Sequence, residues 1–304
     1  MEETSSRLRG KRCAVVTGAN RGIGLEICRQ LASNEIDVIL TARDEKKGTE
    51  AVQSLTPSGL SHVVFQQLDV KDPVSVARLS SFVETRFGKL DILVNNAGDS
   101  GVILNCDAFK EFKLRGLKVC DENAHLLKGI MDQTYEKAKE CVEINYYGTK
   151  RVTEALLPLM QLSRSARIVN VTSFYGQLKY IDNKEVKAEL ENLDSLSVEK
   201  LDGIMQRFLR DFKECKLQAN GWPTTVSAYK VSKAAVNAYT RIIASNYPSF
   251  QVNCIHPGLV KTDMTCNIGN LTAEQGARAP VMLALSPDTG PSGFYFDEMN
   301  ITSF

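Results

Sequence analysis

A tyrosine, a lysine and a serine in the second half of the sequence have the chemistry needed for proton transfer. Tyr229 and Lys233 are four positions apart in a segment with helical periodicity, so their side chains lie on one face of the expected helix. An ammonium group beside a phenol lowers the phenol pKa from its ordinary value of about 10, which favours proton donation near neutral pH. Ser173 comes just after an apolar strand pattern, and its hydroxyl can donate a hydrogen bond to the oxygen that receives the proton. Such a set matches the needs of ketone reduction, in which a developing alkoxide requires an acid and hydrogen-bond donors.

A glycine-rich segment near the N-terminus is typical of a dinucleotide-binding turn. It runs Thr17-Gly-Ala-Asn-Arg-Gly-Ile-Gly24, between an apolar strand pattern and apolar residues at helical spacing. Gly18 permits a tight turn, Gly22 lets the backbone approach a pyrophosphate, and Gly24 lets the helix pack closely on the sheet. Backbone N–H groups at the start of the helix then face the phosphates. The spacing G-x-x-x-G-x-G differs from the common G-x-G-x-x-G fingerprint, so the strand and helix on either side carry much of the evidence.

The end of the second expected strand indicates which nicotinamide cofactor is preferred. An NADH site places an acidic side chain there, where it accepts hydrogen bonds from the ribose 2′-hydroxyl. Here the strand ends with Ala42 and Arg43, and alanine cannot accept such a bond. Arg43 and Arg21 can instead bind a 2′-phosphate through charge-assisted hydrogen bonds, which favours NADPH. Asp44 leaves NADH as the alternative, although an N-cap role for the following helix also accounts for this residue.

Strand patterns alternate with helix patterns along most of the chain, which is typical of a parallel sheet covered by helices. About seven strands are expected, at residues 13–16, 38–40, 63–65, 92–94, 167–171, 252–255 and 294–296. Helical spacing falls between them, most clearly at residues 23–31, 74–87 and 228–244. No linker-like composition or repeat divides the 304 residues. The sequence therefore predicts an α/β fold, a doubly wound parallel sheet of the Rossmann type, as a single domain over residues 1–304.

Two segments interrupt the alternation, at about residues 99–133 and about residues 180–220. Each follows the carboxyl end of an expected strand, where ligands bind in open α/β sheets. We therefore expect the first to be a flap over the substrate and the second to be a helical insertion, with surface decoration as the alternative for both. Apolar residues of the flap favour a hydrophobic substrate; they are Val102, Ile103, Leu104 and Phe109.

Composition and charge limit the other function classes. The 37 basic and 36 acidic residues nearly cancel, so no overall field favours nucleic acid or a membrane surface as a partner. The opening MEETSSRLRGKR does not resemble a secretory leader, and no run approaches the roughly 20 apolar residues of a membrane span, which predicts a cytoplasmic protein. The eight cysteines form no zinc-like cluster, so we expect no metal and reduced thiols that mostly fill the core. The three N-x-[ST] sequons are then expected to stay unmodified.

From about Lys11 to Phe296 the sequence resembles the short-chain dehydrogenases/reductases, because the family's motifs occur in the family's order. These motifs are Thr17–Gly24, Asn95-Asn-Ala-Gly98, Asn145, Ser173, Tyr229-x-x-x-Lys233 and Pro257-Gly258. A tyrosine four positions before a lysine is usually an aromatic at the core edge beside a solvated charge, but the whole set in order is specific. The resemblance implies that Tyr229 is the proton donor, with Lys233, Ser173 and Asn145 as the other catalytic residues. Asn145 would support a water molecule that links the lysine to solvent.

The resemblance also assigns the cofactor contacts. It places Asp69 near the adenine, Asn95 near the adenosine ribose and Thr262 on the nicotinamide side. The other implied contacts are Gly18, Asn20, Arg21, Gly22, Ile23, Gly24, Arg43, Val70, Ala97, Gly98, Tyr229, Lys233, Pro257, Gly258 and Val260. His256 is expected to be a strand residue and not a catalyst.

Longer runs look like the plant salutaridine reductase and menthone (neomenthol) reductase subgroup; they are Phe87-Gly-Lys-Leu-Asp-Ile-Leu-Val-Asn-Asn-Ala-Gly98, Gly221-Trp-Pro223, Ala238-Tyr-Thr-Arg241 and Gly290-Pro-Ser-Gly293. This resemblance implies a hydrophobic terpenoid or alkaloid ketone as substrate. One member of the subgroup, isopiperitenone reductase, reduces a conjugated C=C bond and lacks the motif tyrosine, so the presence of Tyr229 favours carbonyl reduction. Enone reduction and a noncatalytic NADPH-binding regulator on the same fold are the alternatives.

The second irregular segment bears on the oligomeric state. Ser173 and Tyr229 are 56 positions apart, much farther than in most family members, so residues are inserted before the helix that carries Tyr229. Apolar residues fall at helical spacing after a plausible N-cap, Ser197; this apolar stripe is Leu201, Ile204, Met205, Phe208 and Phe212. A short isolated helix is marginal in water, so the stripe must pack on something. The resemblance to monomeric carbonyl reductases, which carry a helical insert here, implies that the stripe covers the usual dimer surface within the chain. We therefore predict a monomer.

Overall fold

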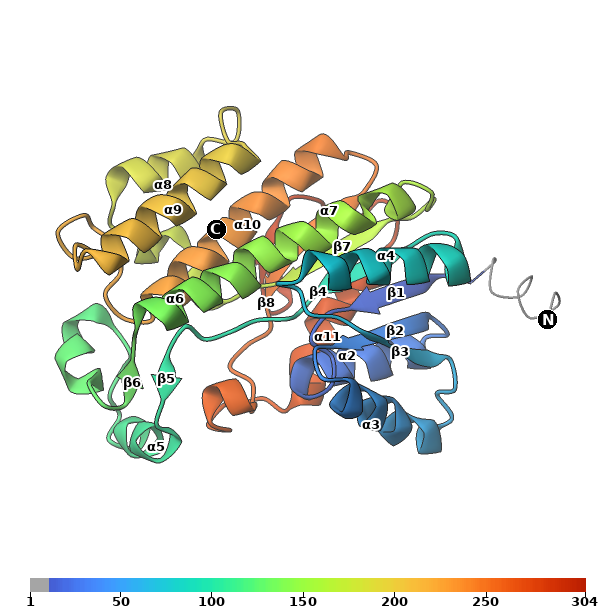
Figure 1. Ribbon diagram of the computed structural model, residues 1–304, viewed down its shortest axis with the longest axis horizontal. Coiled ribbons are helices and arrows are strands. Elements are labelled where there is room, and N and C mark those ends of the chain that lie inside the picture. Colours follow the sequence, from blue (N-terminus) through green and yellow to red (C-terminus); the bar gives the residue numbers. More distant parts are fainter. Residues whose placement is uncertain (1–10) are drawn as a thin grey trace.

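An eight-stranded sheet forms the centre of the computed structural model, which describes residues 11–304 (Figure 1). Its strand order is β10-β9-β8-β7-β4-β1-β2-β3, and only the β9–β10 pair is antiparallel. The strands are β1 (Cys13–Val16), β2 (Asp37–Ala42), β3 (Val63–Gln67), β4 (Ile92–Asn95), β7 (Arg167–Val171), β8 (Gln251–His256), β9 (Tyr295–Asp297) and β10 (Asn300–Thr302). The predicted doubly wound sheet of the Rossmann type is confirmed, and β10 is the strand that the expectation of about seven missed.

Helices cover both faces of the sheet because its strands are apolar on both sides. Successive residues of β1 go to opposite faces: Cys13 and Val15 join one buried cluster, and Ala14 and Val16 join the other. Figure 1 shows the first layer above the sheet; its helices are α4 (Pro73–Phe87), α6 (Tyr135–Val142), α7 (Thr149–Met160) and α10 (Ser227–Asn246). The second layer lies below the sheet and consists of α2 (Gly22–Ser33), α3 (Glu45–Leu55) and α11 (Ala273–Ala284).

The order of the strands reverses at β1. From β1 the chain adds β2 and β3 on one side and then crosses to β4 on the other. Ligands bind beyond the carboxyl ends of the strands at such a switch point. The segments that leave β1 and β4 touch there, because the Asn96 N–H donates to Thr17 Oγ1 at 2.9 Å.

Residues 99–133 fold into a small subdomain-like flap beside the sheet, at the lower left of Figure 1. The flap contains β5 (Ile103–Leu104), α5 (Cys106–Leu114), a 3₁₀ segment (Asp121–Leu127) and β6 (Met131–Asp132), and β5 pairs antiparallel with β6. Phe109, Phe112 and Leu127 form a buried apolar cluster with Ile268 packed against it. Since Ile268 belongs to the loop after β8, the flap packs on a loop from a distant part of the sequence.

A disulfide joins the same two regions. Cys106 begins α5 of the flap and Cys266 lies in the loop after β8, with their Cα atoms 5.4 Å apart. The expectation that all eight cysteines are reduced is therefore wrong for this pair. The two residues are 160 positions apart, and only the folded arrangement of the loops brings them within bonding distance. The other six cysteines are free, and four of them are buried, as core residues should be.

Residues 180–220 form two helices, α8 (Lys184–Glu191) and α9 (Val198–Lys213). The predicted N-cap is confirmed, since Ser197 Oγ accepts from the Lys200 N–H at 3.3 Å. The α9 helix packs on α6 and α10 of the same chain. The apolar stripe is buried at Leu201, Ile204, Met205 and Phe208 and partly buried at Phe212. The insertion therefore covers part of α10 from within the chain.

Shorter helical turns lie at Thr56–Ser58, Phe174–Gly176, Leu178–Tyr180 and Asp263–Thr265, and a π-helical turn lies at Glu143–Gly148. Within residues 11–304, no helix has an apolar stretch that would cross a bilayer. The expectation about a secretory leader concerns the opening segment, of which residues 1–10 lie outside the described part of the chain.

Candidate active site

Tyr229, Ser173 and Lys233 lie together at the carboxyl edge of the sheet. Ser173 follows β7 and caps the 3₁₀ turn after it, since its Oγ accepts from the Tyr175 N–H at 3.2 Å. Tyr229 and Lys233 lie on the first two turns of α10, and Lys233 Nζ is 5.7 Å from the centroid of the Tyr229 ring. The Ser173 hydroxyl is close enough to Tyr229 to act on the pKa of the phenol. The fold thus brings together the predicted proton donor, its hydroxyl neighbour and the lysine.

Burial controls the pKa values of the tyrosine and the lysine. It raises the pKa of Tyr229 to about 12, although the hydrogen bond with Ser173 acts in the opposite direction. Burial lowers the pKa of Lys233 to about 8, because the ammonium loses hydration. Lys233 Nζ donates to the Val171 carbonyl at 2.9 Å. The expected lowering of the phenol pKa by the lysine is not found in the protein chain alone, because desolvation of the phenolate is the larger effect.

Asn145 lies in the π-helical turn between α6 and α7 and is fully buried. Such turns place side chains that a regular helix would direct elsewhere, and they are frequent at functional sites. Asn145 Nδ2 donates to the Asp99 carbonyl and to Ser232 Oγ, both at 3.0 Å, and Oδ1 accepts from the Asp99 N–H at 2.8 Å. A Cβ on Gly98 would lie 3.4 Å from Asn145 Oδ1 and 3.6 Å from Lys233 Nζ, so both side chains border Gly98. The proposed water relay through Asn145 stays a prediction.

The glycine-rich turn has the geometry that its sequence predicts. Gly18 and Gly22 have φ values of +61° and +56°, in the left-handed region that favours glycine. A Cβ on Gly18 would lie 2.8 Å from the Ala97 Cα, and one on Gly24 would lie 2.7 Å from the Gly18 carbonyl oxygen. The turn is therefore packed tightly against the segment that follows β4.

Two polar residues that the sequence analysis did not single out hold this turn. Asn96 Nδ2 donates to the carbonyls of Thr17 and Gly18, both at 3.0 Å. Thr17 Oγ1 accepts from the N–H groups of Asn96 and Ala97, at 2.9 Å and 3.0 Å. The Asn-Asn-Ala-Gly motif was visible in the sequence, but its bracing of the glycine turn depends on β1 and β4 being neighbours.

The start of α2 fits a bound pyrophosphate. Other helices begin with a side-chain cap: Asp44 caps α3, Asp72 caps α4 and Ser197 caps α9. At the corresponding position of α2, Arg21 makes no side-chain cap bond, and the first turn holds no acidic residue. Asn20 and Ile23 flank this start. The uncapped N–H groups and the positive end of the helix dipole thus suit an anion.

Charged residues follow β2 and begin α2, where the sequence predicts contacts with the adenosine end of a dinucleotide. Arg43 is exposed just after β2. Asp44 Oδ1 accepts from the Lys47 N–H at 2.9 Å, so its alternative reading as an N-cap is confirmed. Arg21 forms an ion pair with Asp263 of the loop after β8. Among the described residues, Arg43 has no side-chain hydrogen bond or ion pair.

The other predicted contacts near the adenosine follow β3 and β4. Asp69 and Val70 come after β3, and Asp69 Oδ1 accepts from the Lys71 N–H at 3.0 Å. Asn95 is buried, and its Nδ2 donates to Asn170 Oδ1 at 2.8 Å and Thr153 Oγ1 at 3.0 Å. The Asn95 side chain thus links β4 to β7 and to α7, and its contact with a ribose stays a prediction.

The loop after β8 approaches the glycine-rich turn from the other side. It begins with Pro257-Gly258, where Gly258 has a φ of +84°, and continues through the buried Val260 to Thr262. A Cβ on Gly22 would lie 3.5 Å from Thr262 Cγ2. Thr262 therefore faces the start of α2, and its contact on the nicotinamide side stays a prediction. His256 ends β8, which confirms its reading as a strand residue.

Comparisons with known proteins agree with this arrangement. Residues 12–185 match the family described as short chain dehydrogenase, and residues 217–289 match the one described as enoyl-(acyl carrier protein) reductase. The chain is 50% identical over 303 residues to salutaridine reductase of Papaver somniferum, with 97% of this chain and 96% of that protein covered. It is 48% identical to (+)-neomenthol dehydrogenase of Capsicum annuum, with 96% and 98% covered, and to (−)-isopiperitenone reductase of Mentha piperita, with 94% and 96% covered.

A solved structure gives the same result for the fold. The structure of salutaridine reductase from Papaver somniferum superimposes with a TM-score of 0.87 at 50% identity, over 95% of this chain and 100% of that chain. The resemblance to the salutaridine reductase and menthone reductase subgroup is therefore confirmed. The chain belongs to the short-chain dehydrogenase/reductase family and is an oxidoreductase that uses a nicotinamide cofactor and acts on CH–OH and C=O groups.

Proposed function

We propose that the chain is an NADPH-dependent carbonyl reductase whose substrate is a hydrophobic ketone, either a terpenoid or an alkaloid. The observation that carries the proposal is the cluster of Tyr229, Ser173 and Lys233, in which the Ser173 hydroxyl neighbours the phenol and a buried ammonium lies beside the phenol ring. The proposal treats residues 1–304 as one reductase domain that acts as a monomer.

Each residue of the cluster has a distinct part in the proposed reaction. Bound NADPH supplies the hydride. The hydroxyls of Ser173 and Tyr229 hold the ketone oxygen, and Tyr229 gives up its proton as negative charge develops there. Lys233, when protonated, stabilises the phenolate that remains. Asn145 fixes the backbone at Asp99, beside Gly98, and so keeps this edge of the site in place.

The choice of NADPH rests on the residues after β2. Ala42 is buried and has no acceptor for a ribose 2′-hydroxyl, while the carboxylate of Asp44 is engaged in capping α3. Arg43 remains exposed beside them and can bind a 2′-phosphate with a charge-assisted contact. Arg21 would have to leave Asp263 to join it, so Arg43 is the main determinant in this proposal.

The substrate class rests on the flap and on the relatives. In β5, Ile103 is exposed and Leu104 is partly buried, whereas Val102 and Phe109 are buried within the protein. The first pair is therefore better placed to meet a ligand than the second. Salutaridine reductase and (+)-neomenthol dehydrogenase, the relatives at 50% and 48% identity, are named for alkaloid and terpenoid compounds, which favours a substrate of this kind.

Two other functions remain as alternatives on this fold. The relative named (−)-isopiperitenone reductase makes reduction of a conjugated C=C bond the nearest one. The presence of Tyr229 with its Ser173 and Lys233 neighbours favours carbonyl reduction, because a carbonyl oxygen needs a positioned acid. The presence of all three residues also disfavours a noncatalytic NADPH-binding regulator.

The test is a panel of cyclic terpenoid and alkaloid ketones, each paired with its conjugated enone. NADPH oxidation is followed by absorbance, and the products are identified by mass spectrometry and chromatography. We expect alcohols as products. Saturated ketones would show that the enone alternative is correct, and NADPH binding without any turnover across the panel would favour a regulator.

A further inference from the structure

Helix α10, which carries Tyr229, begins in an unusual way. The residue at its N-cap position, Val226, has φ 45° and ψ 38°, in the left-handed region, and its side chain provides no cap hydrogen bond. A β-branched residue rarely adopts this conformation, so the surrounding structure must hold it there. Tyr229 follows only three positions later, within the first turn of the helix. Whatever holds residues 224–227 therefore also places the phenol.

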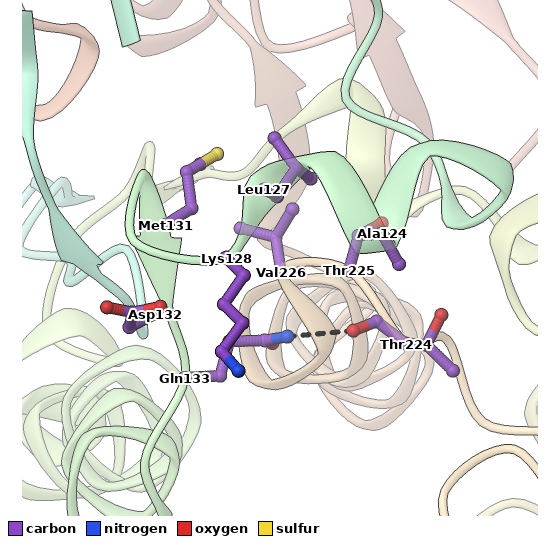
Figure 2. A pocket seen from close by; sticks show the side chains of 9 residues that line it. All are labelled: Ala124, Leu127, Lys128, Met131, Asp132, Gln133, Thr224, Thr225 and Val226. Atoms are coloured by element: carbon purple, nitrogen blue, oxygen red, sulfur yellow. Dashed lines mark hydrogen bonds between the residues drawn. The ribbon is translucent and has the colours of Figure 1, made fainter. Parts of the chain in front are cut away.

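Gln133, at the end of the flap, supplies the cap that Val226 lacks. Its Oε1 accepts from the Ser227 N–H at 2.7 Å and from Ser227 Oγ at 2.8 Å. Its Nε2 donates to the Thr224 carbonyl at 2.7 Å, the dashed contact in Figure 2. One side chain from the flap thus bonds on both sides of Val226 and satisfies the first N–H of the helix.

Asp121, the first residue of the flap's 3₁₀ segment, binds Thr224 and Thr225, the two residues just before Val226. Its Oδ2 accepts from the Thr224 N–H at 2.9 Å, and its Oδ1 accepts from the Thr225 N–H at 3.0 Å and from the Thr225 hydroxyl. Its Oδ1 also accepts from Lys230 Nζ at 2.9 Å. Burial alone would raise the pKa of Asp121, but these hydrogen bonds lower it below its ordinary value. The carboxylate is therefore fixed in its charged form across the junction between flap and helix.

Lys230 is the counterpart of Asp121 on α10. Its residue surface is only 3% exposed, and its ammonium also donates to Thr225 Oγ1 at 2.9 Å. It lies 5.7 Å from the ring centroid of Tyr175, the residue whose N–H is capped by Ser173. A buried ammonium without a carboxylate partner would be costly, so the contact with Asp121 stabilises the Lys230 side chain in its buried position.

A hollow interrupts the apolar packing at this junction. A hollow of about 200 Å³ lies between the flap and residues 224–226, and it is lined on the flap side by Leu127, Lys128 and Met131 (Figure 2). The polar bridges from Asp121 and Gln133 connect the flap to residues 224–227 beside this hollow.

We infer that Asp121 and Gln133 are positioning residues: through them the flap sets the start of α10 and so the place of the Tyr229 hydroxyl relative to Ser173. The inference rests on the proposed function, in which Tyr229 is the proton donor. Displacement of a catalytic group by about an ångström costs a large part of its rate effect, so loss of either bridge should act on the chemical step.

The test compares Gln133→Ala and Asp121→Ala with Gln133→Glu and Asp107→Asn. Gln133→Glu keeps the acceptor for Ser227, loses the donor to Thr224 and places a carboxylate oxygen beside the Thr224 carbonyl. Asp107→Asn is the matched control, because this flap carboxylate is almost fully exposed and pairs with Lys110 of its own helix and not with residues 224–230. We expect each alanine variant to lower kcat by about tenfold while the NADPH Kd changes less than about twofold. Gln133→Glu should regain part of the kcat through the acceptor to Ser227, and Asp107→Asn should behave as the wild type.

Hydrogen exchange of the intact protein gives a second readout that needs no substrate. Amides of residues 224–231 should exchange at least about tenfold faster in Gln133→Ala and Asp121→Ala, with the rest of the sheet unchanged. Unchanged kcat and exchange in both alanine variants would overturn the inference, as would faster exchange throughout the chain, which would show a role in overall folding only. If the exchange result holds but the wild type reduces no ketone, the proposed function fails and the positioning of α10 by the flap stands.

Discussion

The Lys233 ammonium is 2.9 Å from the carbonyl oxygen of Val171 and 5.7 Å from the centroid of the Tyr229 ring. The lysine is thus anchored to the end of β7 while it faces the phenol on its own helix. The partly buried Tyr229 and the buried Lys233 lie side by side with opposite pKa shifts, because removal from water disfavours the phenolate of one and the ammonium of the other. Several measurable properties of the enzyme depend on this pair.

Replacement of Tyr229 by phenylalanine should abolish most ketone reduction and leave NADPH binding intact. The variant keeps the ring that packs in the site and loses only the hydroxyl that gives the proton, a contribution of about 10² to 10⁴ in rate. Turnover is measured by NADPH oxidation and binding by fluorescence titration. Turnover near that of the wild type would contradict the assignment of Tyr229 as the acid.

The pH profile should report the titration of Lys233. With a pKa of about 8, the lysine is charged below that pH and neutral above it, whereas Tyr229, with a pKa of about 12, keeps its proton throughout this range. The kcat/KM for the ketone should therefore decrease as the pH rises through about 8. Lys233→Ala should be slower and should lose this step. A profile of the same shape in the variant would mean that another group titrates.

Arg43→Ala should weaken NADPH binding relative to NADH more than Asp44→Ala does. Loss of a phosphate contact to arginine should cost on the order of 1.5–3 kcal/mol of binding free energy. Asp44→Ala instead removes the cap of α3 and should lower the free energy of unfolding by about 1 kcal/mol. Isothermal titration with both cofactors and thermal unfolding of both variants separate these effects. Equal affinity of the wild type for NADPH and NADH would refute the interpretation of Ala42 and Arg43.

Loss of the Cys106–Cys266 bond should destabilise the protein. The bond closes a loop of 160 residues, and Cys266→Ser should lower the free energy of unfolding by about 2–4 kcal/mol under non-reducing conditions. Cys215→Ser is the control, since Cys215 is free and exposed. Alkylation of the denatured wild type should label six cysteines before reduction and eight after it. Eight labelled cysteines without reduction would show that the bond is absent in solution.

The protein should sediment as a monomer. The α9 helix buries its apolar stripe on α6 and α10 of the same chain, and so removes an apolar face of the catalytic helix from contact with a second copy. Sedimentation equilibrium at micromolar concentration should give the chain mass of 33.6 kDa. Twice this mass would show that the insertion forms an interface.

Local sequence patterns were sufficient for the strands of the sheet other than β10, for helices α2, α4 and α10, and for two caps. Apolar runs bounded by glycines and polar residues marked the strands, and Asp44 and Ser197 marked the starts of α3 and α9, because a cap depends only on residues within one turn. The spacing of Tyr229 and Lys233 likewise placed them on one face of α10. The order of the motifs then indicated the family, which the comparisons confirmed.

Contacts between distant segments were decided only by the tertiary structure. The disulfide between Cys106 and Cys266, the bracing of the glycine turn by Asn96, and the capping of α10 by Asp121 and Gln133 each join parts of the chain that are far apart in sequence. The tertiary structure also decides the direction of the Tyr229 pKa shift. Burial of the phenol depends on all the residues packed around it and not only on the lysine one turn away. A sequence read one segment at a time contains the donors and acceptors of these contacts, but only the arrangement of β1, β4, β7 and β8 in one sheet determines which of them meet.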